Sequence, residues 1–170
     1  EDYDARAEIM WVGTLAHNGL AGCGLGIPGL RDGDWTCHGL EHELSALDTK
    51  ITHGAGLAVI FPAWMRYVWR EHPERFLEFG SQEPVDPEVD ELDVEVTPEQ
   101  AVEYAVEATI DELQEFFVSL GMPRTLSEFG VTEDDIEKMM PGLKINRGES
   151  FGSFMKLTLD DAREIYRSAL

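Results

Sequence analysis

The sequence predicts an all-α protein, a bundle of about six or seven helices that forms a single domain over residues 1–170. Apolar residues recur at the i, i+3, i+4 spacing of amphipathic helices along most of the chain, with no alternating strands and no internal repeat. Segments that begin with Thr and carry Gln or acidic residues in the next turn recur as helix starts. At 170 residues the chain is long enough to bury a core.

The composition argues against several function classes. Lys and Arg number 13 against 34 Asp and Glu, and the net charge of −21 repels nucleic acids and anionic membrane surfaces. No apolar run reaches the roughly 18 residues of a membrane-spanning helix, and no signal-peptide pattern is present, so we expect a cytoplasmic protein without a membrane partner. Cys23 and Cys37 lack CxxC spacing and are expected to be reduced thiols. A start at Glu1 instead of Met suggests a processed product or a piece of a longer polypeptide.

The first part of the chain should contain three helices. The first covers residues 5–18 and ends at Gly19, and a glycine-rich loop follows over residues 19–35. This loop lacks the preceding strand that a dinucleotide-binding fingerprint needs. The second and third helices should run over residues 35–47 and 52–69, the third with a kink at its internal Pro62.

The second part begins with an acidic, proline-containing segment over residues 83–96, which we expect to be an exposed and mobile loop. Thr97 then starts a long helix as an N-cap, with Pro98 at its first position and Gln100 at the capping-box position. Gly121 ends this helix, and further helices should begin at Thr132 and Thr158.

Three of the five histidines lie in one short stretch, HGLEHELSALDTKITH, at residues 38–53. His38 and His42 are at positions i and i+4, on one face of the second helix, and such a pair can bind a divalent metal through imidazole nitrogens. His53 opens the next helix, and the short connection could bring it back toward His38. Histidines at this spacing are also common as surface or hydrogen-bonded core residues, so the spacing alone leaves metal binding open.

Neighbouring residues have less specific readings. The stretch HELSA is not a zincin signature, because Ala46 stands where a second His would be needed. Glu41 and Glu43 are expected to be solvated or salt-bridged and not to be ligands. His17 is interpreted as a capping or packing residue and His72 as an exposed residue. Phe61 and Trp64 could line a substrate pocket, but core packing is the stronger interpretation for both.

These residues resemble the group III, iron-containing alcohol dehydrogenases, and in particular the NAD(P)H-dependent butanol dehydrogenases. The resemblance rests on HGLEHELSA at residues 38–46 and on THGAGLAVI with PAWM at residues 52–65. It extends upstream to ARAEIMW and LAHNG, and downstream to LSEFG at residues 126–130 and to the closing Ile-Tyr pair at residues 165–166. It therefore covers nearly the whole chain.

The resemblance implies that His38 and His53 are metal ligands and that His42 is a catalytic residue near the reacting carbon, where it could shuttle a proton or orient the substrate. The implied cofactors are a divalent metal, iron first and zinc or nickel as alternatives, and NAD or NADP. The metal would act as a Lewis acid on the oxygen of a small alcohol or aldehyde. The loop at residues 47–51 is one residue longer than the common pattern.

Two parts of the family pattern are absent from this sequence. The Asp and His that complete the metal site, which the family carries as DxxxH upstream of the residues that match ARAEIMW, are absent; the DxxxH at residues 34–38 ends on His38 itself and is not this pair. The N-terminal dinucleotide-binding domain is absent as well. The chain thus resembles the C-terminal helical domain of a longer enzyme, and its partner would be the enzyme's own N-terminal domain. The chain alone is expected to be inactive. The full-length protein could form a homodimer. Two alternatives are a stand-alone helical metal-binding or interaction module, and another superfamily member such as a polyol dehydrogenase or a dehydroquinate-synthase-like lyase.

Overall fold

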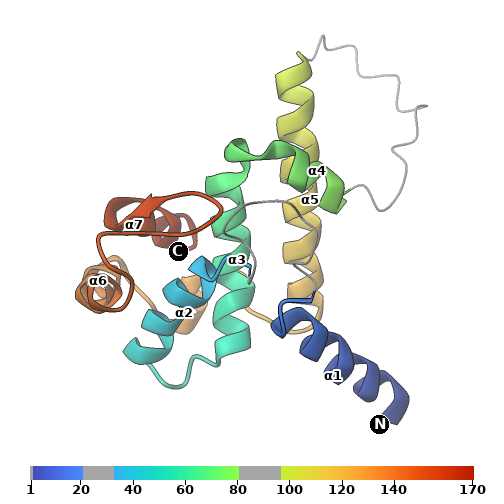
Figure 1. The fold of residues 1–170 in the computed structure, drawn as a ribbon. Coiled ribbons are helices and arrows are strands. Elements are labelled where there is room, and N and C mark those ends of the chain that lie inside the picture. Colours follow the sequence, from blue (N-terminus) through green and yellow to red (C-terminus); the bar gives the residue numbers. More distant parts are fainter. Residues whose placement is uncertain (1, 21–32, 81–96) are drawn as a thin grey trace.

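The computed structural model describes residues 2–20, 33–80 and 97–170 (Figure 1). These ranges form seven α-helices, and the predicted all-α fold is confirmed. The α-helices are α1 (Tyr3–His17), α2 (Thr36–Leu47), α3 (His53–Val68), α4 (Pro73–Gly80), α5 (Pro98–Ser119), α6 (Glu133–Arg147) and α7 (Leu159–Ser168). Two 3-10 helices, Trp69–Glu71 and Leu126–Phe129, and a hairpin of strands β1 (Ser150–Phe151) and β2 (Leu157–Thr158) complete them.

Two segments singled out in the sequence lie outside the described residues. The acidic segment at residues 83–96 is one, and most of the glycine-rich loop, including Cys23, is the other. Among the described residues, no helix combines the length and the apolar character that are needed to cross a membrane.

Helix α3 is the centre of the domain. It packs against α2, α5 and α7, while α6 closes the side formed by α2 and α7 (Figure 1). Its sequence HGAGLAVIFPAWMRYV is apolar on nearly every side, as a helix surrounded by neighbours must be. The helix continues through Pro62. The largest fully buried apolar side chains around it are Leu40, Leu44, Ile60, Ile110, Leu126, Ile136, Leu143, Leu157, Ile165 and Tyr166.

The helix starts predicted at three threonines are confirmed. Thr97, Thr132 and Thr158 each cap a helix in a capping box, with Gln100, Asp135 and Asp161 as the respective third residues. At α5 the Gln100 amide donates to the Thr97 hydroxyl oxygen over 3.2 Å, and the Thr97 amide donates to the Gln100 side chain over 2.9 Å. These reciprocal bonds satisfy donors that every helix leaves free at its start.

Two elements were not predicted. Helix α4 is short and largely polar, and only Phe76 of its residues is buried. The hairpin pairs Ser150 with Thr158 and Phe151 with Leu157 in antiparallel register. Because the strands have only two residues each, they leave no alternating pattern for the sequence to show.

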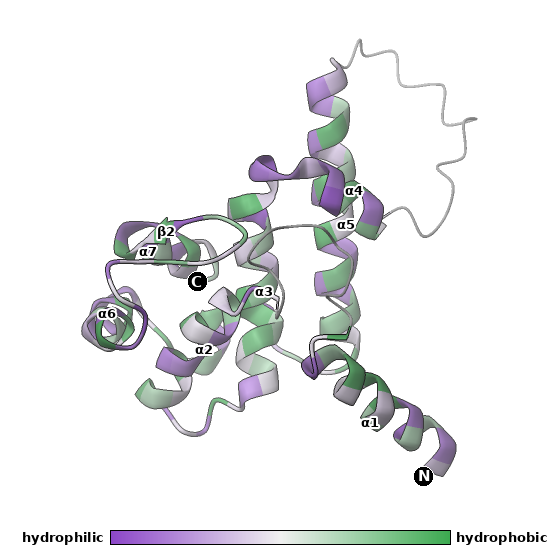
Figure 2. Ribbon diagram, viewed as in Figure 1, coloured by the Kyte–Doolittle hydropathy of each residue, from purple (hydrophilic) through white to green (hydrophobic). Residues whose placement is uncertain are grey.

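The apolar residues of α1 are exposed. This helix extends away from the rest of the domain (Figure 1), and the hydropathy colours show apolar residues along it (Figure 2). None of its residues is buried, and the exposed fractions of Ile9 and Trp11 are 72% and 59%. Residues near the end of α5 behave similarly, since Phe116 and Leu120 of its predicted apolar face are 56% and 60% exposed. Both helices thus carry apolar surface that the described residues do not cover.

Candidate metal centre

The three histidines of the motif lie together where α2 faces the start of α3. His38 and His42 are one turn apart on α2, with ring centroids 6.3 Å from each other. The loop after α2 turns the chain back, so that His53, the first residue of α3, lies 5.1 Å from each of the two other rings. The expectation that the connection returns His53 to the α2 histidines is therefore met.

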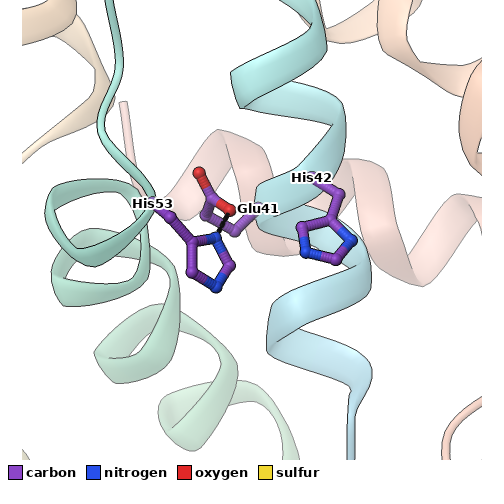
Figure 3. A group of neighbouring side chains, drawn as sticks. All are labelled: Glu41, His42 and His53. Carbon is purple, nitrogen blue, oxygen red and sulfur yellow. Dashed lines mark hydrogen bonds and ion pairs between the residues drawn. The ribbon is translucent and has the colours of Figure 1, made fainter. Parts of the chain in front are cut away.

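The ligand atoms are close enough to share one ion. Among the described residues, one nitrogen of His42, one nitrogen of His53 and one carboxylate oxygen of Glu41 all lie within 4.8 Å of one another (Figure 3). Imidazole nitrogen and carboxylate oxygen are suitable donors for Fe²⁺ and Zn²⁺, so the residues present fit such a metal. His38 is not in this group, although its ring centroid is as near to that of His53 as the centroid of His42 is; the assignment of His38 and His53 as the ligands stays a prediction from the resemblance.

The environment of His38 favours the neutral imidazole that a metal needs. Burial lowers the pKa of His38, and the neighbouring His53, His42 and His17 lower it further. The ring also packs edge-on against Trp35, with centroids 4.7 Å apart. A neutral ring retains a lone pair for coordination at neutral pH.

His17 joins this cluster from α1. Its ring lies 6.2 Å from that of His38 and 5.2 Å from that of Trp35, in agreement with the packing role expected of it. The short distance between His17 and the histidine motif was not predicted, because the sequence of the glycine-rich segment between them does not indicate how the two come together. His72, which was expected to be exposed, is half-buried and packs edge-on against Phe154 at 5.2 Å, away from the metal cluster.

Glu41 and Glu43, which were expected to be solvated or salt-bridged, are both buried and not solvated. The exposed fractions are 0% and 6%. Glu41 contacts Nδ1 of His53 in an ion pair, which agrees with the alternative expectation of a salt bridge (Figure 3). Glu43 accepts a hydrogen bond of 2.7 Å from the Asn146 side chain of α6. Both carboxylates face neighbouring helices, because the side of α2 that carries them packs against α3 and α6.

A mainly apolar cavity of about 410 Å³ adjoins His38. Phe61 and Trp64 line it, and Trp64 is also part of the buried core, so both of the roles considered for these two residues apply. Their rings are stacked with centroids 5.8 Å apart. The remaining lining residues are Asp34, Cys37, Gly54, Leu57, Ala58, Phe117 and Met122.

Two lining residues come from a distant part of the sequence. Phe117 of α5 and Met122 just after it form part of the cavity wall, and the histidine motif gives no indication of them. The Cys37 thiol also faces the cavity, and burial, together with the negative charge of Asp34, raises its pKa well above the ordinary value. The Cys37 thiol is therefore uncharged, and it forms a weakly polar part of the cavity lining.

Asp34, which also lines the cavity, connects the start of α2 to the loop between β1 and β2. One carboxylate oxygen accepts a hydrogen bond of 2.6 Å from the Thr36 amide at the start of α2. The other accepts bonds from the amides of Ser153 and Phe154, at 2.8 and 2.6 Å. The loop between β1 and β2 is thereby attached to the start of α2, one turn before His38.

Known proteins match this chain over its whole length. The model of the Fe-containing alcohol dehydrogenase family, C-terminal, matches residues 1–170. The NADH-dependent butanol dehydrogenase A of Clostridium acetobutylicum is 36% identical over 99% of this chain, and the NADPH-dependent aldehyde reductase YqhD of Escherichia coli is 30% identical, also over 99%. In both cases the match covers 39% of the relative, so the chain spans about two fifths of the length of these proteins.

Solved structures agree with the sequence comparisons. The crystal structure of NADH-dependent butanol dehydrogenase A from Thermotoga maritima superposes with a TM-score of 0.79 at 34% identity, covering 99% of this chain and 39% of that one. The helical architecture, the histidine cluster and the family match all indicate the same family. The chain belongs to the Fe-containing alcohol dehydrogenase family and corresponds to its C-terminal domain.

Proposed function

We propose that this chain is the metal and substrate domain of an NAD(P)H-dependent enzyme that interconverts small alcohols and aldehydes. Its similarity to the NADH-dependent butanol dehydrogenase A of Clostridium acetobutylicum supports this proposal. The observation that carries the proposal is the position of the histidine cluster directly beside the apolar cavity of about 410 Å³. A polar reacting group can lie at the histidines while an aliphatic tail occupies the cavity.

Each histidine has a distinct role in this proposal. His38 and His53 bind a divalent metal, with iron first and zinc or nickel as alternatives. When bound, this metal supplies Lewis-acid polarisation of the substrate oxygen. His42 is exposed on the same face of α2, and it orients the substrate hydroxyl or transfers its proton, because a neutral imidazole has both a donor and an acceptor nitrogen.

The nicotinamide cofactor is assigned to a separate N-terminal domain. Hydride transfer needs a nucleotide held in a fixed position, and the protein contributes binding, orientation and charge to that chemistry. The exposed apolar side chains of α1, 72% exposed at Ile9 and 59% at Trp11, offer a surface for contact with the remainder of the enzyme. NAD and NADP are both compatible with this domain, since their selection would depend on residues of the nucleotide domain.

The experiment is an assay of the full-length protein with butyraldehyde and 1-butanol, using each nicotinamide cofactor. Activity should disappear on treatment with a chelator and return on addition of Fe²⁺, Zn²⁺ or Ni²⁺. Glycerol and other polyols serve as control substrates, because the cavity wall is mainly apolar. Turnover of polyols without turnover of aliphatic aldehydes would assign the protein to another branch of the superfamily and contradict the proposal.

A further inference from the structure

Glu41 is an ionisable side chain that is completely enclosed, with an exposed fraction of 0%. It lies on α2 next to His42, and its carboxylate is directed toward His53 at the start of α3 (Figure 3). A carboxylate in such a place is costly unless its oxygens are hydrogen-bonded or paired with charge. Its partners therefore indicate what the side chain does.

Both oxygens of Glu41 have partners. Oε2 contacts Nδ1 of His53, and Oε1 accepts a hydrogen bond of 2.6 Å from the Ser45 hydroxyl one turn later on α2. The Ser45 hydroxyl also lies 3.3 Å from the carbonyl oxygen of Ile51, in the loop that leads to His53. The carboxylate is thus connected both to the imidazole and to the segment that positions it.

The surroundings leave Glu41 little freedom to move. Gly56, on the first turn of α3, faces the carboxylate directly, and a Cβ atom at this position would lie 2.7 Å from both Cγ and Oε1 of Glu41. Any side chain at position 56 would displace the glutamate. Gly56 therefore provides the space in which Glu41 reaches His53.

The contact defines the tautomer of His53. A carboxylate accepts hydrogen bonds, so the Nδ1 atom beside it carries the proton, and Nε2 keeps its lone pair. In Figure 3 the second ring nitrogen of His53 lies on the side of the ring away from Glu41. Nε2 is consequently the atom presented to an ion in the space between α2 and α3.

We propose that Glu41 is a positioning residue for metal binding, which orients His53 and holds the proton on its Nδ1 so that Nε2 is free for the ion, without binding the ion itself. The inference rests on the proposed function, in which His53 is a metal ligand. Carboxylates behind metal-binding histidines act in this way, and their loss typically costs about 10- to 100-fold in metal affinity. Glu41 lies at Nδ1 of His53, and the second ring nitrogen faces away from it, which favours a place behind the imidazole over direct coordination (Figure 3).

The test is the Zn²⁺ affinity of the full-length protein, measured by competition with a chelator. Glu41→Gln keeps the shape of the side chain and removes its charge, and it should weaken Zn²⁺ binding by about 10- to 100-fold. Ser45→Ala removes the partner of Oε1 and should weaken binding by a smaller factor. Glu43→Gln is the matched control, because Glu43 is also buried on α2 but bonds Asn146 and no histidine; its Zn²⁺ affinity should equal that of the wild type.

Several outcomes would overturn the inference. Equal Zn²⁺ affinity of Glu41→Gln and the wild type is one, and an equal loss in the Glu43→Gln control is another. A zinc–oxygen bond of about 2.0–2.2 Å to Glu41 in a structure of the Zn²⁺-loaded protein would make Glu41 a ligand and not a positioning residue. If Glu41→Gln does not fold, ¹⁵N NMR of the wild-type protein decides: a proton on Nδ1 of His53 with zinc on Nε2 supports the inference, and the reverse contradicts it. A wild-type protein that binds none of Zn²⁺, Fe²⁺ and Ni²⁺ would contradict the proposed function as well.

Discussion

The buried hydroxyl of Tyr166 donates a hydrogen bond of 2.6 Å to the carbonyl oxygen of Leu40. Tyr166 lies on α7, near the end of the chain, and Leu40 lies on α2 between two histidines of the metal cluster; both side chains are 0% exposed. Burial raises the pKa of Tyr166 well above its ordinary value, and the charges of Glu43 and Glu41 raise it further. The last helix thus stabilises the helix that carries the site.

Tyr166→Phe should lower the free energy of unfolding by about 1 kcal/mol, the usual net value of one buried hydrogen bond. The aromatic ring and its packing remain, so the overall fold should persist. Urea denaturation of the 170-residue chain, followed by circular dichroism, measures the shift. Tyr104→Phe is the control, because Tyr104 is 65% exposed and its hydroxyl should contribute little. Equal midpoints for the two variants would show that the bond to Leu40 does not stabilise the domain.

The parts of the fold that could be predicted are those with local signals. Thr97, Thr132 and Thr158 cap helices through side-chain contacts within one turn, and such contacts are visible in the sequence. Helix α4 was not predicted, because its eight residues are too few for a helical pattern to be distinguished and it packs against α5, which follows later in the chain. The exposure of the α1 side chains could not be predicted either, because a pattern of apolar residues does not show whether another part of the protein covers them.

The site could be predicted in the same way only in part. The histidine motif gave His38, His42 and His53, but the burial of Glu41 depends on Gly56, in a different helix. Acidic residues beside a histidine usually face water, and the sequence gives no sign that this one does not. Phe117 reaches the cavity through the packing of α5 on α3, a contact between helices far apart in the chain.

The 170-residue chain alone should neither oxidise 1-butanol nor reduce butyraldehyde with NADH or NADPH. Hydride transfer requires a bound nicotinamide, and the strands of the described residues form a hairpin without the βαβ unit of a dinucleotide-binding domain. Initial rates at 340 nm, with the full-length protein as positive control, measure this directly. Turnover by the purified chain would refute the assignment of the cofactor to a separate domain.

Alanine variants of the full-length protein separate the roles of the three histidines. His38→Ala and His53→Ala should lose bound metal and activity together, because each removes one of the two proposed ligands. His42→Ala should lower kcat by about 10²- to 10⁴-fold, the range for loss of a general acid or base, while retaining the metal. Elemental analysis after desalting gives the metal content of each variant. Metal loss in His42→Ala with retention in His38→Ala would instead identify His42 and His53 as the pair of ligands.

Phe61→Ala should change substrate preference without abolishing activity. Phe61 is half-buried and lines the cavity beside His38, so its removal enlarges the space for an aliphatic tail. One methylene in an apolar pocket is worth about 1–3 kcal/mol of discrimination, and we expect the ratio of kcat/KM for octanal over butyraldehyde to rise about tenfold or more. Phe79→Ala, at a residue that is 50% exposed, is the control and should leave the ratio unchanged. An unchanged ratio in Phe61→Ala would place the substrate tail elsewhere.

The hydrogen bond between Tyr67 of α3 and Asp161 of α7 should make stability depend on pH in the alkaline range. The Tyr67 hydroxyl donates to the carboxylate over 2.6 Å, and this bond, aided by burial, raises the pKa of Tyr67 from 10.0 to about 12. Because the folded-state pKa is the higher one, the contribution to stability is complete below pH 10 and decreases as the pH rises toward about 12.

Tyr67→Phe tests this dependence. It should lower the free energy of unfolding by about 1 kcal/mol at pH 7, the net value of the lost hydrogen bond. The difference from the wild type should be the same at pH 9 and should shrink between pH 10 and about 12, as the unfolded wild-type chain loses the Tyr67 proton more readily than the folded one. Urea midpoints of both proteins across this range measure the difference, with Tyr104→Phe as an exposed control. A difference that stays constant or grows above pH 10 would contradict the raised pKa of Tyr67 and its cause, the bond to Asp161.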